Sequence, residues 1–252
     1  MSRFEGNVAV VTGGGHGIGE ATARRLGAEG ATVALADVKD PTAAIARLAA
    51  DGIDAHPYVL DVSDEQAVDD FAGRVGADLG PVDVLVNNAG VLLTGTALTV
   101  ALEDWRRTFS VNVDGLLLMA RAFLPGMIER GDGAIVNVAS TGGLYGVGNL
   151  VAYNASKGAV VNLTRNLSTD FMRAGVRINC VCPGWVQTGF NDPLLEGVTE
   201  EDVEQLIDRT VPAGRQSDPS EIAAAIAFLA SNDASYVSGI AFVVDGGLTA
   251  AL

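Results

Sequence analysis

A tyrosine and a lysine stand four residues apart at Tyr153 and Lys157, within the small-residue segment AYNASKGAV. Residues at this spacing lie one above the other on the same face of a helix. A phenol has an ordinary pKa of about 10, so it is a poor base at neutral pH. A neighbouring ammonium group favours the phenolate and makes the phenol easier to deprotonate. The pair therefore has the residue types and spacing of a proton-transfer unit, although a solvated helix face with two polar residues would show the same pattern.

A glycine-rich segment, TGGGHGIGE at 12–20, follows the first apolar run of the sequence. Its glycines have the spacing G-x-x-x-G-x-G, at Gly13, Gly17 and Gly19. Between a strand and a helix, such glycines let the backbone approach a pyrophosphate, and the helix offers its positive N-terminus and free N–H groups. The position of this loop after the first strand predicts a dinucleotide site.

An acidic residue, Asp37, ends the second apolar run, 18 residues after Gly19. A carboxylate at this distance can accept hydrogen bonds from the adenosine ribose and would repel a 2′-phosphate. The loop carries His16 where a 2′-phosphate would favour arginine, and Val38 follows Asp37. The sequence therefore predicts NAD rather than NADP, with a simple turn residue as the alternative interpretation of Asp37.

Short apolar runs alternate with longer helical patterns along the whole chain, which predicts a doubly wound parallel sheet covered by helices on both faces. We expect one Rossmann-like α/β domain over 1–252, with about seven parallel strands. The expected strands are 7–12, 31–37, 56–62, 82–88, 133–140, 176–183 and 239–247. The expected helices are 17–29, 41–51, 64–79, 103–130, 152–173 and 219–231.

Residues 184–218 interrupt this alternation, because they lack a clear strand. An insertion of this length in a compact domain favours a functional lid, and we call 184–218 the lid. Its acidic residues predict a solvated face; they are Asp192, Glu196, Glu200, Glu201, Asp202, Glu204 and Asp208.

The chain of 252 residues carries a formal charge of −15 from 16 basic and 31 acidic residues, which argues against nucleic acid or an anionic membrane as a partner. The apolar stretch 115–128 contains Arg121 and Pro125, and Glu5 interrupts the N-terminal segment, so we expect neither a membrane span nor export. Cys180 and Cys182 point to the same face of any strand that holds them. We expect them to fill the core, without metal or disulfide, in a cytoplasmic protein.

Taken together, the motifs resemble those of a short-chain dehydrogenase/reductase over about residues 5–247. The glycine segment and Tyr153-x-x-x-Lys157 are joined by NNAG at 87–90, SVNVDG around Asn112 and VNVAS ending in Ser140. PGWVQT at 183–188 and VDGG at 244–247 complete the order of motifs that is typical of the family. The resemblance implies an oxidoreductase that transfers a hydride between NAD(H) and an alcohol or ketone, commonly as a homotetramer.

The family resemblance implies a role for each of four catalytic residues. Tyr153 would be the acid/base, and Lys157 would lower its pKa and bind the nicotinamide ribose. Ser140 would hydrogen-bond the substrate oxygen, and Asn112 would hold a water that connects Lys157 to solvent. The implied cofactor-binding residues are Gly13, Gly15, His16, Gly17, Ile18, Gly19, Asp37, Val38, Asp61, Val62, Asn88, Ala89, Gly90, Tyr153, Lys157, Pro183, Gly184, Val186 and Thr188. Ser63, two residues after Asp61, is also expected to cap the following helix.

The residues expected beside the nicotinamide are mainly apolar and lack a basic cluster. They are Leu92, Leu93, Gly142, Leu144, Tyr145, Trp185 and Phe190. We therefore expect a neutral, mainly hydrophobic secondary alcohol or ketone as substrate. The alternatives are an NADPH-dependent 3-oxoacyl-acyl-carrier-protein reductase, which shares these motifs, and a non-catalytic protein that senses dinucleotides.

Overall fold

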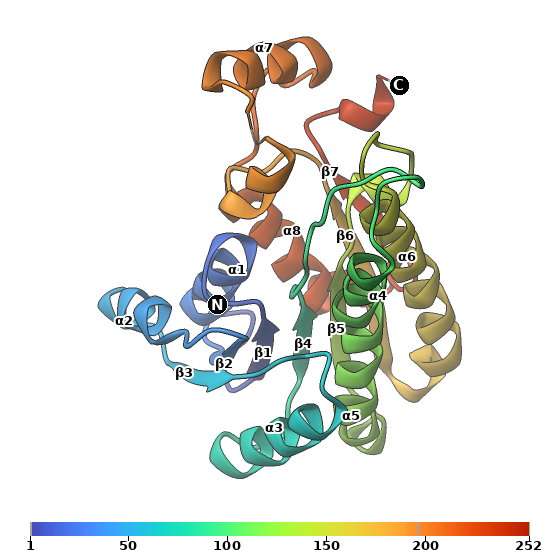
Figure 1. Ribbon diagram of the computed structural model, residues 1–252. Coiled ribbons are helices and arrows are strands. Elements are labelled where there is room, and N and C mark those ends of the chain that lie inside the picture. Colours follow the sequence, from blue (N-terminus) through green and yellow to red (C-terminus); the bar gives the residue numbers. More distant parts are fainter. Residues whose placement is uncertain (1, 196, 252) are drawn as a thin grey trace.

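The computed structural model describes residues 2–195 and 197–251, and the seven strands within this part of the chain form one parallel sheet (Figure 1). Glu196 of the acidic lid residues therefore lies outside the described residues. The strand order in the sheet is β3-β2-β1-β4-β5-β6-β7, and every pairing is parallel. The strands are β1 Val8–Thr12, β2 Thr32–Asp37, β3 Ala55–Val59, β4 Val84–Asn87, β5 Gly133–Val138, β6 Val176–Pro183 and β7 Ala241–Val244.

Helices follow the strands and cover both faces of the sheet (Figure 1). They are α1 Gly17–Ala28, α2 Thr42–Ala50, α3 Glu65–Asp78, α4 Leu102–Phe109, α5 Gly115–Arg130, α6 Val151–Phe171, α7 Glu200–Thr210 and α8 Pro219–Ala230. A π-helical turn, η1 (Ser110–Asp114), joins α4 to α5. The helix expected over 103–130 is therefore continuous, but it consists of two α-helices with this turn between them. The expected doubly wound α/β fold is confirmed.

Alternating strand residues belong to two apolar cores, one on each face of the sheet. Val11, Leu35 and Val136 pack with α1, α2 and α8 on one face. Their neighbours Val10, Ala34 and Ile135 pack with α3, α5 and the C-terminal half of α6 on the other face. Because successive strand side chains point to opposite faces, two buried faces require the continuous apolar runs seen in the sequence. Cys180 and Cys182 are both buried in a smaller cluster with Val160 of α6.

Length and composition would let one stretch, Leu102–Arg130, cross a membrane, with a mean hydropathy of 1.4. Half of the 18-residue apolar window in this stretch is buried inside the protein. Met119 and Met127 belong to the core on the face of the sheet that α3 and α5 cover. A core helix of this kind meets the same criteria of length and hydropathy, so its apolar character is explained by packing.

The lid contains more regular structure than the sequence analysis expected. A 3-10 segment, η4 (Gly189–Leu194), is followed by α7, and Val203 and Ile207 of α7 are buried. Thr199 caps α7 by accepting a hydrogen bond from the Asp202 N–H. In Figure 1 the lid lies above the sheet, near the C-terminal end of the chain.

Three local predictions are wrong. β3 ends at Val59 and β7 covers only Ala241–Val244, so both are shorter than expected. Ser63 does not cap α3, because Asp64 accepts the capping hydrogen bond from Ala67 N–H, while the Ser63 hydroxyl donates to Asp61 at 2.6 Å. Aspartate caps helices as well as serine does. The Ser63 hydroxyl is already engaged in its hydrogen bond to Asp61.

Candidate active site

A cavity of about 820 Å³ lies at the carboxyl ends of the strands, between the glycine-rich loop and the lid. This edge is where doubly wound sheets bind their ligands, because the strand order reverses there. Here the reversal falls at β1, which pairs with β2 on one side and β4 on the other. The loops after several strands therefore contribute to one continuous site.

The glycine-rich loop fits closely between β1, α1 and the segment after β4. A Cβ atom on Gly19 would lie 2.2 Å from the Gly13 carbonyl oxygen, so no larger residue fits there. Gly13 has a φ of +61° and would bring a Cβ within 2.9 Å of the Ala89 Cα. The Asn88 side chain, from the segment after β4, stabilises the loop: its Nδ2 donates to the carbonyls of Thr12 and Gly13 at 3.0 and 2.9 Å.

Asp37 lies at the edge of the cavity, with its carboxylate fixed by the backbone. Its Oδ2 accepts from Gly15 N–H at 3.0 Å, and its Oδ1 accepts from Lys39 N–H at 3.1 Å. Each oxygen has a further lone pair that can accept from a ligand hydroxyl. Gly15 itself does not line the cavity and acts through this hydrogen bond.

The next pair, Asp61 and Val62, lines the cavity beside Asp37, as expected. The Ser63 hydroxyl and N–H both donate to Asp61 and hold its pKa below the ordinary value. Arg107 of α4 faces the same region and also favours the charged form of Asp61. Sequence reasoning missed Arg107, because the spacing within α4 does not show which face meets the cavity.

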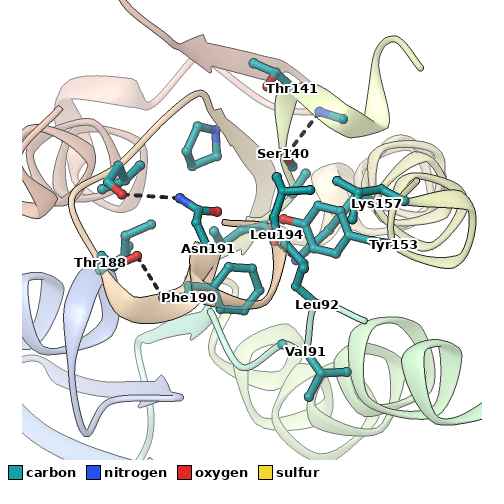
Figure 2. Close-up of a pocket in the computed structure, with 18 of the residues that line it drawn as sticks. Val91, Leu92, Ser140, Thr141, Tyr153, Lys157, Thr188, Phe190, Asn191 and Leu194 are labelled. Carbon is teal, nitrogen blue, oxygen red and sulfur yellow. Dashed lines mark hydrogen bonds between the residues drawn. The ribbon is translucent and has the colours of Figure 1, made fainter. Parts of the chain in front are cut away.

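Tyr153 is buried at the other end of the cavity, with 8% of its surface exposed. Burial raises the pKa of its phenol to about 12, and a hydrogen bond with the Ser140 side chain acts in the opposite direction. Ser140 also accepts from the Gly142 N–H at 3.1 Å, which orients its hydroxyl (Figure 2). The structure thus brings the two groups expected to contact the substrate oxygen into one hydrogen-bonded unit.

Lys157 lies one turn along α6 from Tyr153, with its Nζ 5.7 Å from the centre of the phenol ring. The Nζ donates to the Val138 carbonyl at 2.8 Å, and burial lowers the pKa of the Lys157 amine to about 8. Burial of the phenol is the largest influence on its pKa in this structure, and the expectation that a charged Lys157 lowers that pKa stays a prediction. The lysine is aimed at the end of β5 rather than at the phenol oxygen.

Asn112 does not line the large cavity and is 2% exposed. Its Oδ1 accepts from Val91 N–H at 2.8 Å, while its Nδ2 donates to the Val91 carbonyl and to Ser156 Oγ, each at 3.0 Å. Both polar atoms of this side chain have protein partners and Oδ1 keeps one lone pair, so the expectation that Asn112 holds a water stays a prediction. A Cβ on Gly90 would lie 3.3 Å from Asn112 Oδ1 and 3.5 Å from Lys157 Nζ, so Gly90 lets these groups approach closely.

Most of the predicted cofactor residues line the cavity together. Gly15 and Gly19 lie behind the loop surface, and the others are on the cavity wall. Those on the wall are Gly13, His16, Gly17, Ile18, Asp37, Val38, Asp61, Val62, Asn88, Ala89, Gly90, Tyr153, Lys157, Pro183, Gly184, Val186 and Thr188. A Cβ on Gly17 would lie 3.0 Å from the Thr188 Cγ2, so the lid meets the glycine loop at this point.

The substrate end of the cavity is apolar around Tyr153. Leu92, Gly142, Tyr145, Trp185 and Phe190 line it as predicted, and the Phe190 ring centre lies 6.0 Å from that of Tyr153 (Figure 2). Leu93 and Leu144 do not line it, and Leu144 is 42% exposed, so these two predictions are wrong. The lid contributes to this end as expected, but sequence reasoning did not single out Leu206, Arg209 and Thr210 within it, nor Asn154 of α6 and Leu248 of the C-terminal segment.

The residues present fit a nicotinamide dinucleotide. The glycine loop leaves no room for side chains, α1 directs its N-terminus toward the cavity, and Asp37 supplies a fixed acceptor for ribose hydroxyls. A seven-stranded doubly wound sheet with Ser140, Tyr153 and Lys157 grouped at its carboxyl edge defines a nicotinamide-dependent oxidoreductase.

Comparison with known proteins shows the family directly. A family model described as enoyl-(acyl carrier protein) reductase matches residues 13–249. The meso-2,3-butanediol dehydrogenase of Serratia marcescens is 43% identical over 249 residues, 98% of this chain and 96% of that protein. A 2-(S)-hydroxypropyl-CoM dehydrogenase of Xanthobacter autotrophicus is 42% identical over 254 residues, 99% of each chain. The crystal structure of levodione reductase has a TM-score of 0.93 at 37% identity and covers 99% of this chain and 100% of its own.

Two further relatives bear on substrate and cofactor. A 3-oxoacyl-acyl-carrier-protein reductase of Thermotoga maritima is 36% identical over 248 residues, 98% of this chain and 99% of that protein. A gluconate 5-dehydrogenase of Burkholderia cenocepacia, solved in complex with NADP and tartrate, has a TM-score of 0.92 at 33% identity and covers 100% of this chain and 99% of its own. The chain belongs to the short-chain dehydrogenase/reductase family. It is an oxidoreductase that acts on CH–OH donors with a nicotinamide cofactor.

Proposed function

We propose that the protein interconverts neutral, mainly hydrophobic secondary alcohols and their ketones with NAD rather than NADP. The observation that carries the cofactor preference is the Asp37 carboxylate, which both the glycine loop and Lys39 N–H hold at the cavity edge. A 2′-phosphate at this place would meet a like charge. Lys39 also lines the cavity, so the preference depends on Asp37 rather than on the absence of cations.

The chain's own residues handle the proton and the orientation of the substrate. Ser140 would donate its hydroxyl hydrogen to the substrate oxygen, and the Tyr153 phenolate would take the alcohol proton. NAD, when bound, supplies the hydride acceptor for the alcohol carbon. Leu92, Leu194 and Phe190 surround the phenol and exclude water from it (Figure 2).

The substrate preference is supported by the apolar wall around Tyr153. Leu92, Leu150 and Tyr153 form a buried cluster on which Val147, Phe190 and Leu194 pack. A secondary alcohol with two hydrocarbon arms can bury both arms against such a wall, at about 25 cal/mol per Å² of apolar surface. Arg209 of α7 also lines the cavity, and a guanidinium can bind a carboxylate. The substrates tested below therefore include a hydroxy acid.

An NADPH-dependent 3-oxoacyl-acyl-carrier-protein reductase is the second candidate, supported by the Thermotoga maritima relative. An acidic carrier protein would be repelled by a chain of net charge −15. A non-catalytic dinucleotide sensor is the third, and the grouping of Ser140, Tyr153 and Lys157 at one end of the cavity argues against it.

The test is a set of initial rates: oxidation of neutral secondary alcohols and of a hydroxy acid with NAD and with NADP, and reduction of an acyl-carrier-protein ketone with NADH and with NADPH. We expect turnover of the neutral alcohols, with kcat/KM higher for NAD than for NADP. Activity on anionic substrates alone would contradict the substrate proposal, and faster turnover of the acyl-carrier substrate with NADPH would favour the reductase.

We also propose a homotetramer located in the cytoplasm. The family resemblance implies the tetramer, and it is supported by the apolar Val243 of the edge strand β7 and by Ile240 just before that strand, which are 37% and 40% exposed. Light scattering of the purified protein tests the assembly, and cell fractionation tests the location.

A further inference from the structure

One wall of the cavity is a loop between β5 and α6, and its tip is residues 146–148. All three tip residues line the cavity. Among the described residues, the tip has a single hydrogen bond, in which Asn154 Nδ2 donates to the Val147 carbonyl at 2.8 Å. The residues on either side are better held, because Tyr145 N–H donates to the Thr141 carbonyl and Gly95 N–H donates to the Asn149 carbonyl.

The tip has little stiffness of its own. Gly146 and Gly148 flank Val147, and a Cβ atom on either glycine would have no heavy atom within 4 Å. Asn149 follows with a φ of +60°, in the left-handed region. Glycine restricts the backbone less than any other residue, so the position of Val147 depends on the bond from Asn154 and on its own packing.

Val147 packs where its position matters for the reaction. It lies against the apolar cluster of Leu92, Leu150 and Tyr153, beside the phenol that takes the proton. A shift of Val147 away from this cluster would widen the space next to the reacting carbon. The tip therefore controls the room available to the substrate.

Asn154 is suited to hold this tip in one place. It follows Tyr153 directly on α6 and is half-buried. Its Oδ1 is buried with no hydrogen-bond partner and faces Gly142, where an added Cβ would lie 2.6 Å away. Turning the amide over would set Oδ1 against the Val147 carbonyl oxygen, so the interaction needs the amide as a donor.

We propose that Asn154 is a positioning residue that ties the tip of the wall, residues 146–148, to the catalytic helix and so sets the size of substrate that the cavity accepts. This inference rests on the proposed oxidation of secondary alcohols at Tyr153. Removal of the tie would let Val147 move, so bulky alcohols would gain relative to small ones.

Two variants, Asn154→Ala and Asn154→Asp, test the tie. Alanine removes the amide, while aspartate keeps the shape and replaces the donor with an oxygen that repels the Val147 carbonyl. We expect the ratio of kcat/KM for 2-butanol over 1-phenylethanol to fall about 5- to 10-fold in both, the range set by one hydrogen bond and a small change in pocket size. Hydrogen exchange at the amides of 146–148 should quicken in both variants.

The matched control is Asn166→Ala. Asn166 is an exposed asparagine on the same helix whose Nδ2 donates to the Asn162 carbonyl at 3.1 Å, away from the cavity. We expect it to leave both the ratio and the exchange rates of the tip unchanged. A second change, Gly146→Ala, added to Asn154→Ala should restore part of the ratio, since alanine stiffens the tip and has room for its Cβ.

The proposal is overturned if Asn154→Ala lowers kcat/KM by the same factor for both alcohols, or if Asn154→Asp behaves as the wild type. It is also overturned if exchange at the tip stays unchanged in either variant. Failure of the proposed function is distinct, because the wild-type enzyme would then oxidise neither alcohol, and the exchange measurement would still decide whether Asn154 holds the tip.

Discussion

The phenol of Tyr153 and the amine of Lys157 are both buried, and burial moves their pKa values in opposite directions. The neutral form is favoured in each case, so the pKa of the phenol rises to about 12 and that of the amine falls to about 8. The base for alcohol oxidation is thus present as phenolate in only a small fraction of molecules at neutral pH. An ammonium at Lys157 still favours that phenolate wherever the lysine is protonated.

The first prediction is a pH dependence of kcat/KM for alcohol oxidation. Because the pKa of Tyr153 lies above the working range, each pH unit multiplies the phenolate fraction by about ten. We expect log kcat/KM to rise with a slope near 1 up to about pH 8. Above that pH Lys157 loses its proton and its help to the phenolate, so the profile should level off. Initial rates between pH 6 and 10 measure this.

The control for this profile is Tyr153→Phe, which removes the phenol and keeps the ring. We expect about 10²- to 10⁴-fold slower turnover, the usual contribution of a general acid or base, with dinucleotide binding retained. A flat wild-type profile, or a variant that keeps its activity, would show that the proton goes elsewhere.

At the scale of the elements, the buried Arg177 of β6 holds the end of α8. Its guanidinium donates to the carbonyls of Leu229 and Ala230, at 2.6 and 2.9 Å, and to that of Ala234 at 3.3 Å. The last carbonyls of a helix lack partners inside the helix, so a charged donor from the sheet satisfies them. Because α8 packs on α1, this contact supports the helix whose N-terminus faces the cavity.

The second prediction concerns Arg177→Met, which keeps much of the volume and leaves three carbonyls without this donor. We expect the free energy of unfolding to fall by about 2–4 kcal/mol. For a domain of this size, that corresponds to a Tm lower by about 5–15 °C. Thermal unfolding followed by circular dichroism measures it, with the exposed Arg173→Met as the matched control. Equal Tm values for the two variants would show that the contact contributes nothing.

The sequence predicted the elements that follow a local rule and missed those fixed by distant contacts. The strands were predictable because two buried faces demand continuous apolar runs, and Tyr153 and Lys157 because a helix brings residues four apart together. α7 was missed, although Thr199 as a cap and the spacing of Val203, Ile207 and Val211 could have revealed it. The bond from Lys157 to Val138 and the exposure of Leu144 depend on how α6 meets the end of β5, which no spacing in the chain encodes.

At the scale of the whole molecule, residues at the ends of six strands, β1 to β6, line the cavity, together with residues of α4, α6, the lid and the C-terminal segment around Leu248. A ligand that fills it therefore contacts nearly every part of the fold at once. Such a ligand binds the folded state and not the unfolded chain, so its binding free energy adds to the stability of the whole domain.

The third prediction is a difference in thermal stabilisation between NAD and NADP. At a concentration a hundredfold above its Kd, a ligand adds about 2.7 kcal/mol to the free energy of unfolding. In a domain of this size that raises the Tm by about 5–10 °C. We expect NAD to reach this shift and NADP at the same concentration to fall clearly short, because its 2′-phosphate meets the Asp37 carboxylate. Asp37→Ala should bring the two shifts together, mainly by reducing that of NAD, whereas Tyr153→Phe, far from the adenosine ribose, should keep the difference between the two shifts. Differential scanning calorimetry of the six combinations of three proteins and two ligands, without any substrate, separates cofactor choice from catalysis. A larger shift with NADP, or an unchanged difference in Asp37→Ala, would show that another group, such as Lys39 at the same edge, decides which dinucleotide binds.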